Sequence, residues 1–276
     1  MKILWFLQRN LLRALIVILA VGFVAACNDD DSPSGPGDIN DTGNQPGVLA
    51  NSNDVAGYPT IMTDDVEGIY ISSEILTTFG LGGDPVFPSR TGLALLRGEG
   101  RDLSSTLING FRLSTGTLNG WSGGLVEASI HPQSGRFKND GVQLHSFYSD
   151  GHDDAPIFFE EVRSIDPIEL TYPVKDQKID KNSDLTVRWS DPDPTGDYYY
   201  GLNVYVAAGA GGYNVFLDKS QLSHTVPKRY FQTVLNNENG VRIQISKLRY
   251  VKRVRGGKNH VFAVNYGIEP VFEYED

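Results

Sequence analysis

The chain has 276 residues, of which 40% are hydrophobic and 11% aromatic, and it contains 30 glycines. This composition is typical of a turn-rich globular β protein and excludes a disordered chain. The net charge of −10 argues against general binding of nucleic acids. Because there is a single cysteine, no disulfide bond can form within the chain, and a folded domain must depend on burial alone.

Residues 1–26 have the pattern of a signal peptide. Lys2, Arg9 and Arg13 come before an apolar stretch at 14–26 that contains no polar side chain. That stretch is shorter than the ~20 residues that a membrane-spanning helix needs, and it has the length of the apolar region of a secretory signal. The sequence therefore predicts export across a membrane.

The end of the apolar stretch, Val24-Ala25-Ala26-Cys27, resembles a bacterial lipobox. The resemblance implies cleavage before Cys27, a diacylglyceryl group on its sulfur, and an acyl group such as palmitate on the new amino terminus. It implies a lipoprotein of the cell envelope, with the outer membrane favoured and the globular part periplasmic or exposed at the cell surface. An ordinary secretory signal followed by a chance cysteine is the alternative.

Residues 27–58 predict a flexible acidic tether. Asn, Asp, Ser, Gly and Pro dominate this stretch, and bulky apolar residues are too few to offset the entropy of ordering the backbone. A tether of about 30 flexible residues has a root-mean-square reach of roughly 30 Å. This is enough to hold a globular body clear of lipid headgroups.

Residues 59–165 predict an N-terminal β domain. Short runs of β-type residues alternate there with Gly, Asn, Asp and Ser, which favours a small antiparallel meander, sandwich or barrel. The runs are 68–72, 92–96, 107–113, 124–130, 141–148 and 156–162. No helix longer than two turns is expected anywhere after residue 26.

Residues 166–276 predict a second β domain, with strands at 168–173, 184–190 and 199–206. Trp189 alternates with Leu185 and Val187, a Pro-rich loop follows, and the next strand is aromatic. This part resembles an immunoglobulin or fibronectin type III sandwich, although the cysteine pair of antibody domains is absent. The expected fold class is therefore all-β, with two antiparallel β domains after a flexible lipidated tether. Such sandwiches host many unrelated functions.

The segment 247–258 is a candidate binding face because it has six cations and no acid. Gly256-Gly257 predicts a two-residue hairpin turn with a strand on each side. Alternation then puts four cations on one face, opposite Leu248, Tyr250 and Val254. These four are Lys247, Arg249, Arg253 and Arg255. Such a face suits an anionic envelope polymer, lipid headgroups or an acidic partner, and a solvated hairpin balanced by neighbouring acids is the alternative.

Tyr198, Tyr199 and Tyr200 are a candidate aromatic patch, since exposed tyrosines at the end of a sandwich stack on sugars or anchor a protein interface. Alternation places Tyr199 on the face opposite Tyr198 and Tyr200. Packing within an aromatic-rich β domain is the favoured alternative.

Three further patterns carry weaker signals. Ser122 lies in a Gly-x-Ser-x-Gly string, but a strand-like segment follows where a nucleophile elbow needs a helix, so a Gly-rich hairpin turn is favoured. Asp191 begins half of a calcium-loop pattern, whose twelfth position is Leu202 instead of Glu, so a solvated loop is favoured. His145 and His152 lie near three aspartates, but their spacing of seven residues favours an exposed polar loop over a metal site.

The sequence as a whole predicts a membrane-anchored envelope protein that acts as a non-enzymatic binding or structural module, without a metal or other cofactor. Its expected partners are the lipid bilayer, through acylated Cys27, and an envelope polymer or protein. A glycan-binding module that uses the tyrosines is one rival. An envelope hydrolase that uses Ser122, or a metal at His145 and His152, is the other.

Overall fold

The computed structural model describes residues 65–77, 87–118, 121–129, 131–194, 198–206, 212–217, 219–231 and 240–275. The predicted signal peptide, Cys27 and the tether lie outside these residues. The regular secondary structure of the described part is almost all β-strand, which confirms the all-β fold class. Its only helical segments are two short 3-10 turns, η3 (Ser134–Phe137) and η4 (Lys228–Tyr230). The chain divides into two units, Met1–Gly43 and Asn44–Asp276, and every described residue belongs to the second.

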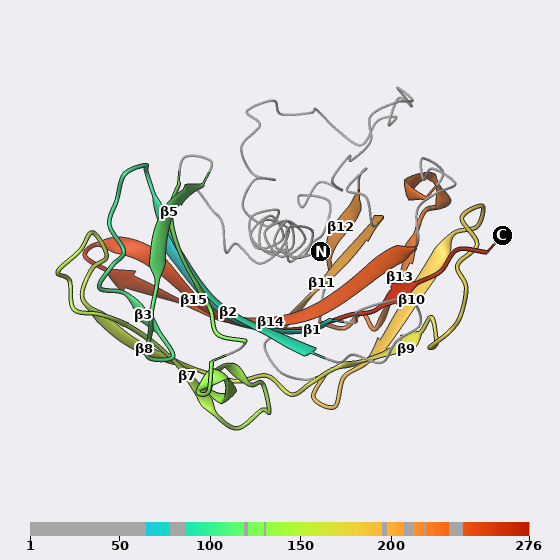
Figure 1. Ribbon diagram of the computed structural model, residues 1–276, viewed down its shortest axis with the longest axis horizontal. Coiled ribbons are helices and arrows are strands. Elements are labelled where there is room, and N and C mark those ends of the chain that lie inside the picture. Colours follow the sequence, from blue (N-terminus) through green and yellow to red (C-terminus); the bar gives the residue numbers. More distant parts are fainter. Residues whose placement is uncertain are drawn as a thin grey trace, which may run out of the picture. The chain divides into compact units, whose positions relative to one another are not determined.

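A nine-stranded sheet runs through this unit (Figure 1). Its strand order is β12-β11-β14-β15-β1-β2-β6-β5, and β16 pairs with β14. The strands are β1 (Val66–Thr77), β2 (Phe87–Arg97), β5 (Ser114–Leu118), β6 (Trp121–Glu127), β11 (Tyr199–Val206), β12 (Gly212–Leu217), β14 (Val241–Arg255), β15 (Lys258–Glu269) and β16 (Val271–Phe272). All neighbours pair antiparallel except β1 and β15, which pair parallel.

Two smaller antiparallel sheets pack against one face of the nine-stranded sheet. The first has the order β4-β3-β7-β8, and the second has the order β13-β10-β9. Their strands are β3 (Leu107–Ile108), β4 (Phe111–Arg112), β7 (Leu144–Ser149), β8 (Phe158–Arg163), β9 (Glu169–Tyr172), β10 (Leu185–Ser190) and β13 (Ser223–Val226).

The covered face of the large sheet, which we call the core face, forms one continuous hydrophobic core with both smaller sheets. On the side of the first small sheet, Phe147 of β7 packs on Phe262 of β15, with ring centroids 5.7 Å apart. On the side of the second, Trp189 of β10 meets Tyr200 of β11 edge to face at 5.4 Å. Burial of Trp189, Leu185 and Val187 agrees with the alternation read from the sequence.

Most predicted strands are present, with one clear error at 107–113. That segment is a hairpin, β3 to β4, because Asn109 and Gly110 have positive φ angles of 54° and 79°. Asn-Gly is the residue pair that a tight two-residue turn favours. The two-residue turn that the sequence does predict, Gly256-Gly257, joins β14 to β15 as expected, with φ angles of 56° and 78°.

The predicted boundary between 59–165 and 166–276 does not separate two bodies. Strands β1, β2, β5 and β6 of the first range and β11, β12, β14 and β15 of the second belong to the same sheet. The physical reason is the parallel pairing of β1 with β15, which joins residues almost 200 positions apart, such as Val66 and Asn259. The two-sheet packing expected for 166–276 is present, but its larger sheet continues into the N-terminal strands.

Candidate functional site

The structure brings the predicted basic face and the predicted tyrosine patch together in one buried group, the Lys247 cluster. Lys247 on β14 lies opposite Tyr200 on β11 in the sheet register. Its Nζ is 2.6 Å from Oδ1 of Asp191 and 3.8 Å from the ring centroid of Tyr198. The side chains of Lys247 and Asp191 are both fully buried. The ion pair therefore fixes the Pro-rich loop that follows β10, which begins at Asp191, to the core face of the sheet.

Tyrosine hydroxyls complete the Lys247 cluster. Tyr200 donates a hydrogen bond to Oδ2 of Asp191, and Tyr198 donates to Oδ2 of Asp193 at 3.1 Å. Arg249 lies over the ring of Tyr198, 4.5 Å from its centroid, and donates to its hydroxyl. Because Tyr198 and Tyr200 are buried, the three tyrosines do not form an exposed aromatic patch.

Tyr199 lies on the opposite face, as the alternation predicts. It is half-buried and stacks on Tyr250, with ring centroids 5.8 Å apart. Asp191, in turn, is neither a calcium ligand in a half-loop nor a solvated loop residue. Its oxygens accept from Lys247, from Tyr200 and from the backbone N–H of Asp193.

Burial controls the electrostatics of the Lys247 cluster. It lowers the pKa of Lys247, and the neighbouring Asp191 carboxylate acts in the opposite direction by stabilising the ammonium. Burial raises the pKa of Tyr198 to about 12 and also raises the pKa of Tyr200. Both tyrosine hydroxyls therefore stay protonated and act as hydrogen-bond donors. With Lys247 closed off from solvent, these groups hold the loop and the sheet together and leave no amine for a reaction.

The remaining two predicted cations, Arg253 and Arg255, both pair with Glu160 of β8. The four cations do share one face, as predicted, but it is the core face. Val254, on the other face, is 61% exposed. Alternation identifies which residues share a face, but it does not identify which face is covered. Each of the four positive charges is therefore engaged by a group from the chain itself.

Ser122 is buried in strand β6 and has both hydrogen-bonding roles in use. Its Oγ donates to the carbonyl of Gly98 at 2.9 Å and accepts from the N–H of Arg101 at 2.7 Å. The residues around it continue as strand, without the strand-turn-helix that a nucleophile elbow requires. Ser122 therefore holds the loop that follows β2.

The two candidate metal-binding histidines differ in burial, because His145 is fully buried and His152 is exposed. The nearby carboxylates form hydrogen bonds to backbone N–H groups instead. Asp153 accepts from the N–H of Ser105, and Asp154 accepts from the N–H of Asp102. Within the described residues, no group of three or more potential ligands is arranged to hold a metal ion.

His145 takes part in a contact that the sequence did not reveal. Its Nδ1 lies 2.7 Å from Oγ of Ser72 and 3.1 Å from Nδ2 of Asn109. The N–H of Ser146 donates to Oδ1 of Asn109, which fixes the amide so that its NH₂ group faces His145. Nδ1 is therefore an acceptor and the imidazole is neutral. Burial lowers the pKa of His145 to about 4. Because Ser72 and His145 are both inaccessible to solvent, this serine–histidine pair is a packing device.

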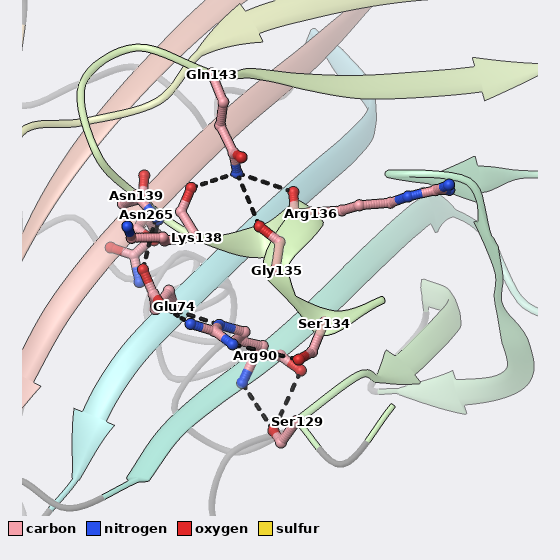
Figure 2. Close-up of polar contacts among 10 residues, drawn as sticks. All are labelled: Glu74, Arg90, Ser129, Ser134, Gly135, Arg136, Lys138, Asn139, Gln143 and Asn265. Carbon is pink, nitrogen blue, oxygen red and sulfur yellow. Dashed lines mark hydrogen bonds and ion pairs between the residues drawn. The ribbon is translucent and has the colours of Figure 1, made fainter. Parts of the chain in front are cut away.

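A second buried network is centred on Glu74 of β1 (Figure 2). Its Oε1 accepts two hydrogen bonds from Arg90 of β2, at 2.9 and 2.7 Å, and its Oε2 accepts from the N–H of Asn139 at 2.6 Å. Asn139 in turn donates to the carbonyl of Asn265 at 3.2 Å, and Arg90 donates to Ser134 at 3.3 Å. The carboxylate thus anchors the segment 131–143 to the large sheet.

Among the described residues, several exposed apolar side chains gather on the outward face of β7 and β8. Tyr148 and Phe159 lie directly opposite each other there and are 39% and 61% exposed, and Ile157 beside them is 74% exposed. Leu107 of β3 continues the row, opposite Tyr148. Leu144 extends the apolar area along β7. Exposed apolar areas of this kind mark interaction surfaces in soluble proteins.

Strand β8 also forms an edge of its sheet. The N–H of Ser164 donates to the carbonyl of Gln143. Because hydrogen-bonded pairs alternate along two antiparallel strands, the backbone groups of the even-numbered residues of β8 form the hydrogen bonds to β7. The backbone groups of Phe159 and Glu161 then point away from β7. No hydrogen bond from the described residues reaches them, whereas the carbonyl of Arg163 accepts from Arg249. We call Phe159–Glu161, with Tyr148 and Ile157, the β8 surface.

No helix among the described residues is long and apolar enough to cross a membrane. Comparison of the sequence with protein-family models and with curated proteins finds no match.

Proposed function

We propose that this protein is a lipid-anchored protein of the bacterial envelope that binds another protein non-enzymatically, through the β8 surface. The anchor is the acylated Cys27 implied by the lipobox-like sequence. The observation that carries the binding role is the coincidence, on one strand, of exposed apolar side chains and outward-pointing backbone groups.

The chemistry of the β8 surface favours an extended protein segment as its partner. Backbone N–H and C=O groups at a sheet edge are satisfied by adding a strand, and neighbouring side chains supply the specificity. Phe159 and Ile157 provide an apolar contact for alternate side chains of such a strand. A sugar would use the rings of Tyr148 and Phe159 but not the backbone edge, so the glycan alternative gains less support.

A binding role also agrees with the use of the polar groups elsewhere. Ser122, His145, Lys247 and Glu74 resemble catalytic residues by type, and each is buried in hydrogen bonds that join two elements of the fold. Their positions support a structural role for each. A hydrolase would need at least one of them to be reachable by a substrate.

The anchor is tested by cell fractionation. Acyl chains contribute about 0.8 kcal/mol for each buried methylene, so the acylated protein should remain with membranes after a salt wash. Cys27→Ser should release the protein from the membrane fraction or leave it with its signal uncleaved. Wild-type protein that is mature and fully soluble would contradict the lipoprotein assignment.

The binding role is tested by photo-crosslinking in the intact envelope, with a photoreactive amino acid at position 159. We expect a discrete protein adduct there, and none at position 222, where Leu222 is exposed on a different part of the molecule. Glu161→Pro removes one outward-pointing N–H without removing a bond to β7, so it should abolish the adduct. Glu161→Thr keeps that N–H and is the matched control.

Two results would overturn the binding role. Equal adducts at positions 159 and 222 would mean that contact is non-specific. Loss of the adduct in Glu161→Thr as well as in Glu161→Pro would mean that the backbone edge is not recognised. Saturable binding of peptidoglycan or lipopolysaccharide fragments that is lost on Tyr148→Ala but unaffected by Glu161→Pro would favour the glycan alternative instead.

A further inference from the structure

The open edge of β8 lies over β14 of the large sheet. Phe147 of β7 packs on Phe262 of β15, and β8 follows β7 in the order of its own sheet. At the end of β8, the side chain of Arg249 on β14 donates to the carbonyls of Arg163 and Ser164, at 3.3 and 3.4 Å. A strand added to β8 therefore runs above β14, with its inner side chains toward the core face.

The inner side of this edge has an excess of positive charge. Glu160 of β8 pairs with two arginines of β14, Arg253 and Arg255. Within the described residues, Glu160 is the only carboxylate paired with either arginine, and the side chain of Arg253 remains 48% exposed. The buried Phe147 lies opposite Glu160 on β7, so the excess charge lies toward the open edge.

The outer side of the same edge has one negative charge beside an apolar area. Glu161 is exposed there, and no ion pair from the described residues reaches it. Arg163, two residues later, donates instead to the carbonyl of Gly141. Phe159, two residues before Glu161, lies opposite Tyr148 and is exposed. An approaching strand therefore meets a carboxylate and an aromatic ring in succession.

Antiparallel pairing fixes the order in which a partner strand meets these groups. The outward-pointing backbone groups of Phe159 and Glu161 each form a hydrogen-bonded pair with the residue opposite. Glu160 then faces its opposite residue in a non-hydrogen-bonded pair, where side chains approach most closely. An acid there lies beside Arg253, which bridges it to Glu160, so two carboxylates balance two guanidiniums. Opposite charges on neighbouring strands stabilise a sheet.

We propose that the β8 surface selects an antiparallel segment of its partner that carries a cation, an acid and an apolar residue in this order. The cation lies opposite Glu161, the acid opposite Glu160 and beside Arg253, and the apolar residue opposite Phe159. This inference rests on the proposed function, to which it adds the chemistry of the partner. A segment in which the cation and the acid exchange places puts like charges together at Glu161 and at Arg253.

The test uses two short synthetic peptides and the purified mature protein in detergent. The first peptide carries Lys, Glu and the photoreactive apolar residue benzoylphenylalanine in that order, with a Thr-Val pair at each end. The control peptide exchanges the Lys and the Glu, so the two peptides have the same composition and charge. We expect at least about tenfold more adduct with the first peptide at low salt. Mass spectrometry should place the adduct at Phe159 or its neighbours Tyr148 and Ile157.

Charge changes in the protein should alter this preference. Glu161→Lys should remove it, because the cation of the first peptide then meets a cation. Glu169→Lys, at an exposed position of β9, adds the same charge and should leave the preference unchanged. Arg253→Gln should reduce it by removing the excess charge on the inner side. Circular dichroism shows whether each variant is folded, and Glu161→Lys, which changes an exposed side chain, decides the test if Arg253→Gln unfolds.

Equal adducts of the two peptides, or an adduct with neither, would overturn the inference. If the adducts are equal and Glu161→Pro abolishes both, strand addition at β8 stands and only the charge order fails, so this failure is distinct from failure of the proposed function. In the intact envelope, the partner segment cross-linked at position 159 should contain the three residue types in the stated order. A partner segment without that order would also overturn the inference.

Discussion

His145 is a buried base that its hydrogen bonds hold in the neutral form. The NH₂ group of Asn109 and the hydroxyl of Ser72 both face Nδ1 of His145. Protonation of Nδ1 would therefore place its new N–H against the NH₂ donor of Asn109, which is unfavourable. Burial lowers the pKa of His145 to about 4, and burial lowers that of His260 to about 4 as well. In the unfolded chain both groups return to their ordinary pKa of about 6.5.

We therefore expect acid to destabilise the fold between about pH 6.5 and pH 4. Over this range the unfolded chain takes up protons that the folded protein does not bind, so the free energy of unfolding falls as the pH falls. His145→Gln should reduce that loss by up to about 3 kcal/mol. His152→Gln, which changes an exposed histidine, should not. Urea unfolding at several pH values measures the free energy of unfolding of the wild type and the two variants. The same dependence of this free energy on pH in all three proteins would contradict the prediction.

At the scale of single residues, the sequence predicts which side chains share a face but not which face is buried. In β8 the order Phe158, Phe159, Glu160, Glu161 puts one phenylalanine and one glutamate on each side. The structure buries Glu160 beside Arg253 and exposes Phe159. Nothing local to these four residues distinguishes the two outcomes, because the choice depends on β14, which is distant in the sequence.

At the scale of elements, the segment 131–143 contains a 3-10 turn but no strand, and side chains hold it in place. Gln143 donates from its amide to the carbonyls of Gly135 and Arg136, at 3.4 and 3.1 Å, and to that of Lys138 (Figure 2). Glu74 ties the segment to β1 through Asn139. The order of this segment thus depends on a carboxylate that lies more than 50 positions earlier.

Glu74→Gln should loosen this segment. The change leaves Arg90 without its charge partner and costs about 3 kcal/mol of stability, as expected when one member of a buried ion pair is removed. Amide exchange should speed up across 131–143 and remain slow in β10 and β13. Glu161→Gln, at an exposed site, is the control. Unchanged exchange across 131–143 in Glu74→Gln would mean that other contacts hold the segment.

Elements with strong local signals were predicted best. The β14–β15 hairpin follows from Gly256-Gly257 between two β-type runs, and β10 follows from the alternation of Leu185, Val187 and Trp189. The sequence patterns do not predict strands β5, β12, β13 and β16 or the turn at Asn109-Gly110. The run at 107–113 has β-type residues on both sides of the Asn-Gly pair, so the pattern predicts one continuous strand there.

At the scale of the whole molecule, strands from both predicted domains contribute to one large sheet and one core. This arrangement was not visible in the sequence, which suggested a boundary at 165 because two sets of strands flank Asp166-Pro167. No periodicity or turn residue reports the pairing of β1 with β15. That pairing depends on side-chain complementarity across most of the chain length.

A single sheet and core should unfold in one cooperative transition. The proposed cleavage before Cys27 removes Trp5 and leaves two tryptophans, Trp121 and Trp189, one from each predicted domain. Single-tryptophan variants, Trp189→Phe and Trp121→Phe, therefore report on the two halves separately. We expect each variant to show the same urea midpoint by fluorescence as by circular dichroism. A midpoint for Trp121 fluorescence that differs from the circular dichroism midpoint of the same variant would indicate independent domains.

The parallel pairing of β1 with β15 also sets the order in which the protein can fold. Of the described strands, β1 is the first to emerge from the ribosome, and its partner β15 is among the last. Contacts such as that between Tyr70 and His260 close a loop of 190 residues, and such non-local contacts slow folding. One edge of β1 therefore stays open until nearly the whole chain has been delivered. A chain with this topology cannot complete its large sheet until β15, near the end of the given sequence, has been made. This delay is compatible with crossing a membrane in an unfolded state.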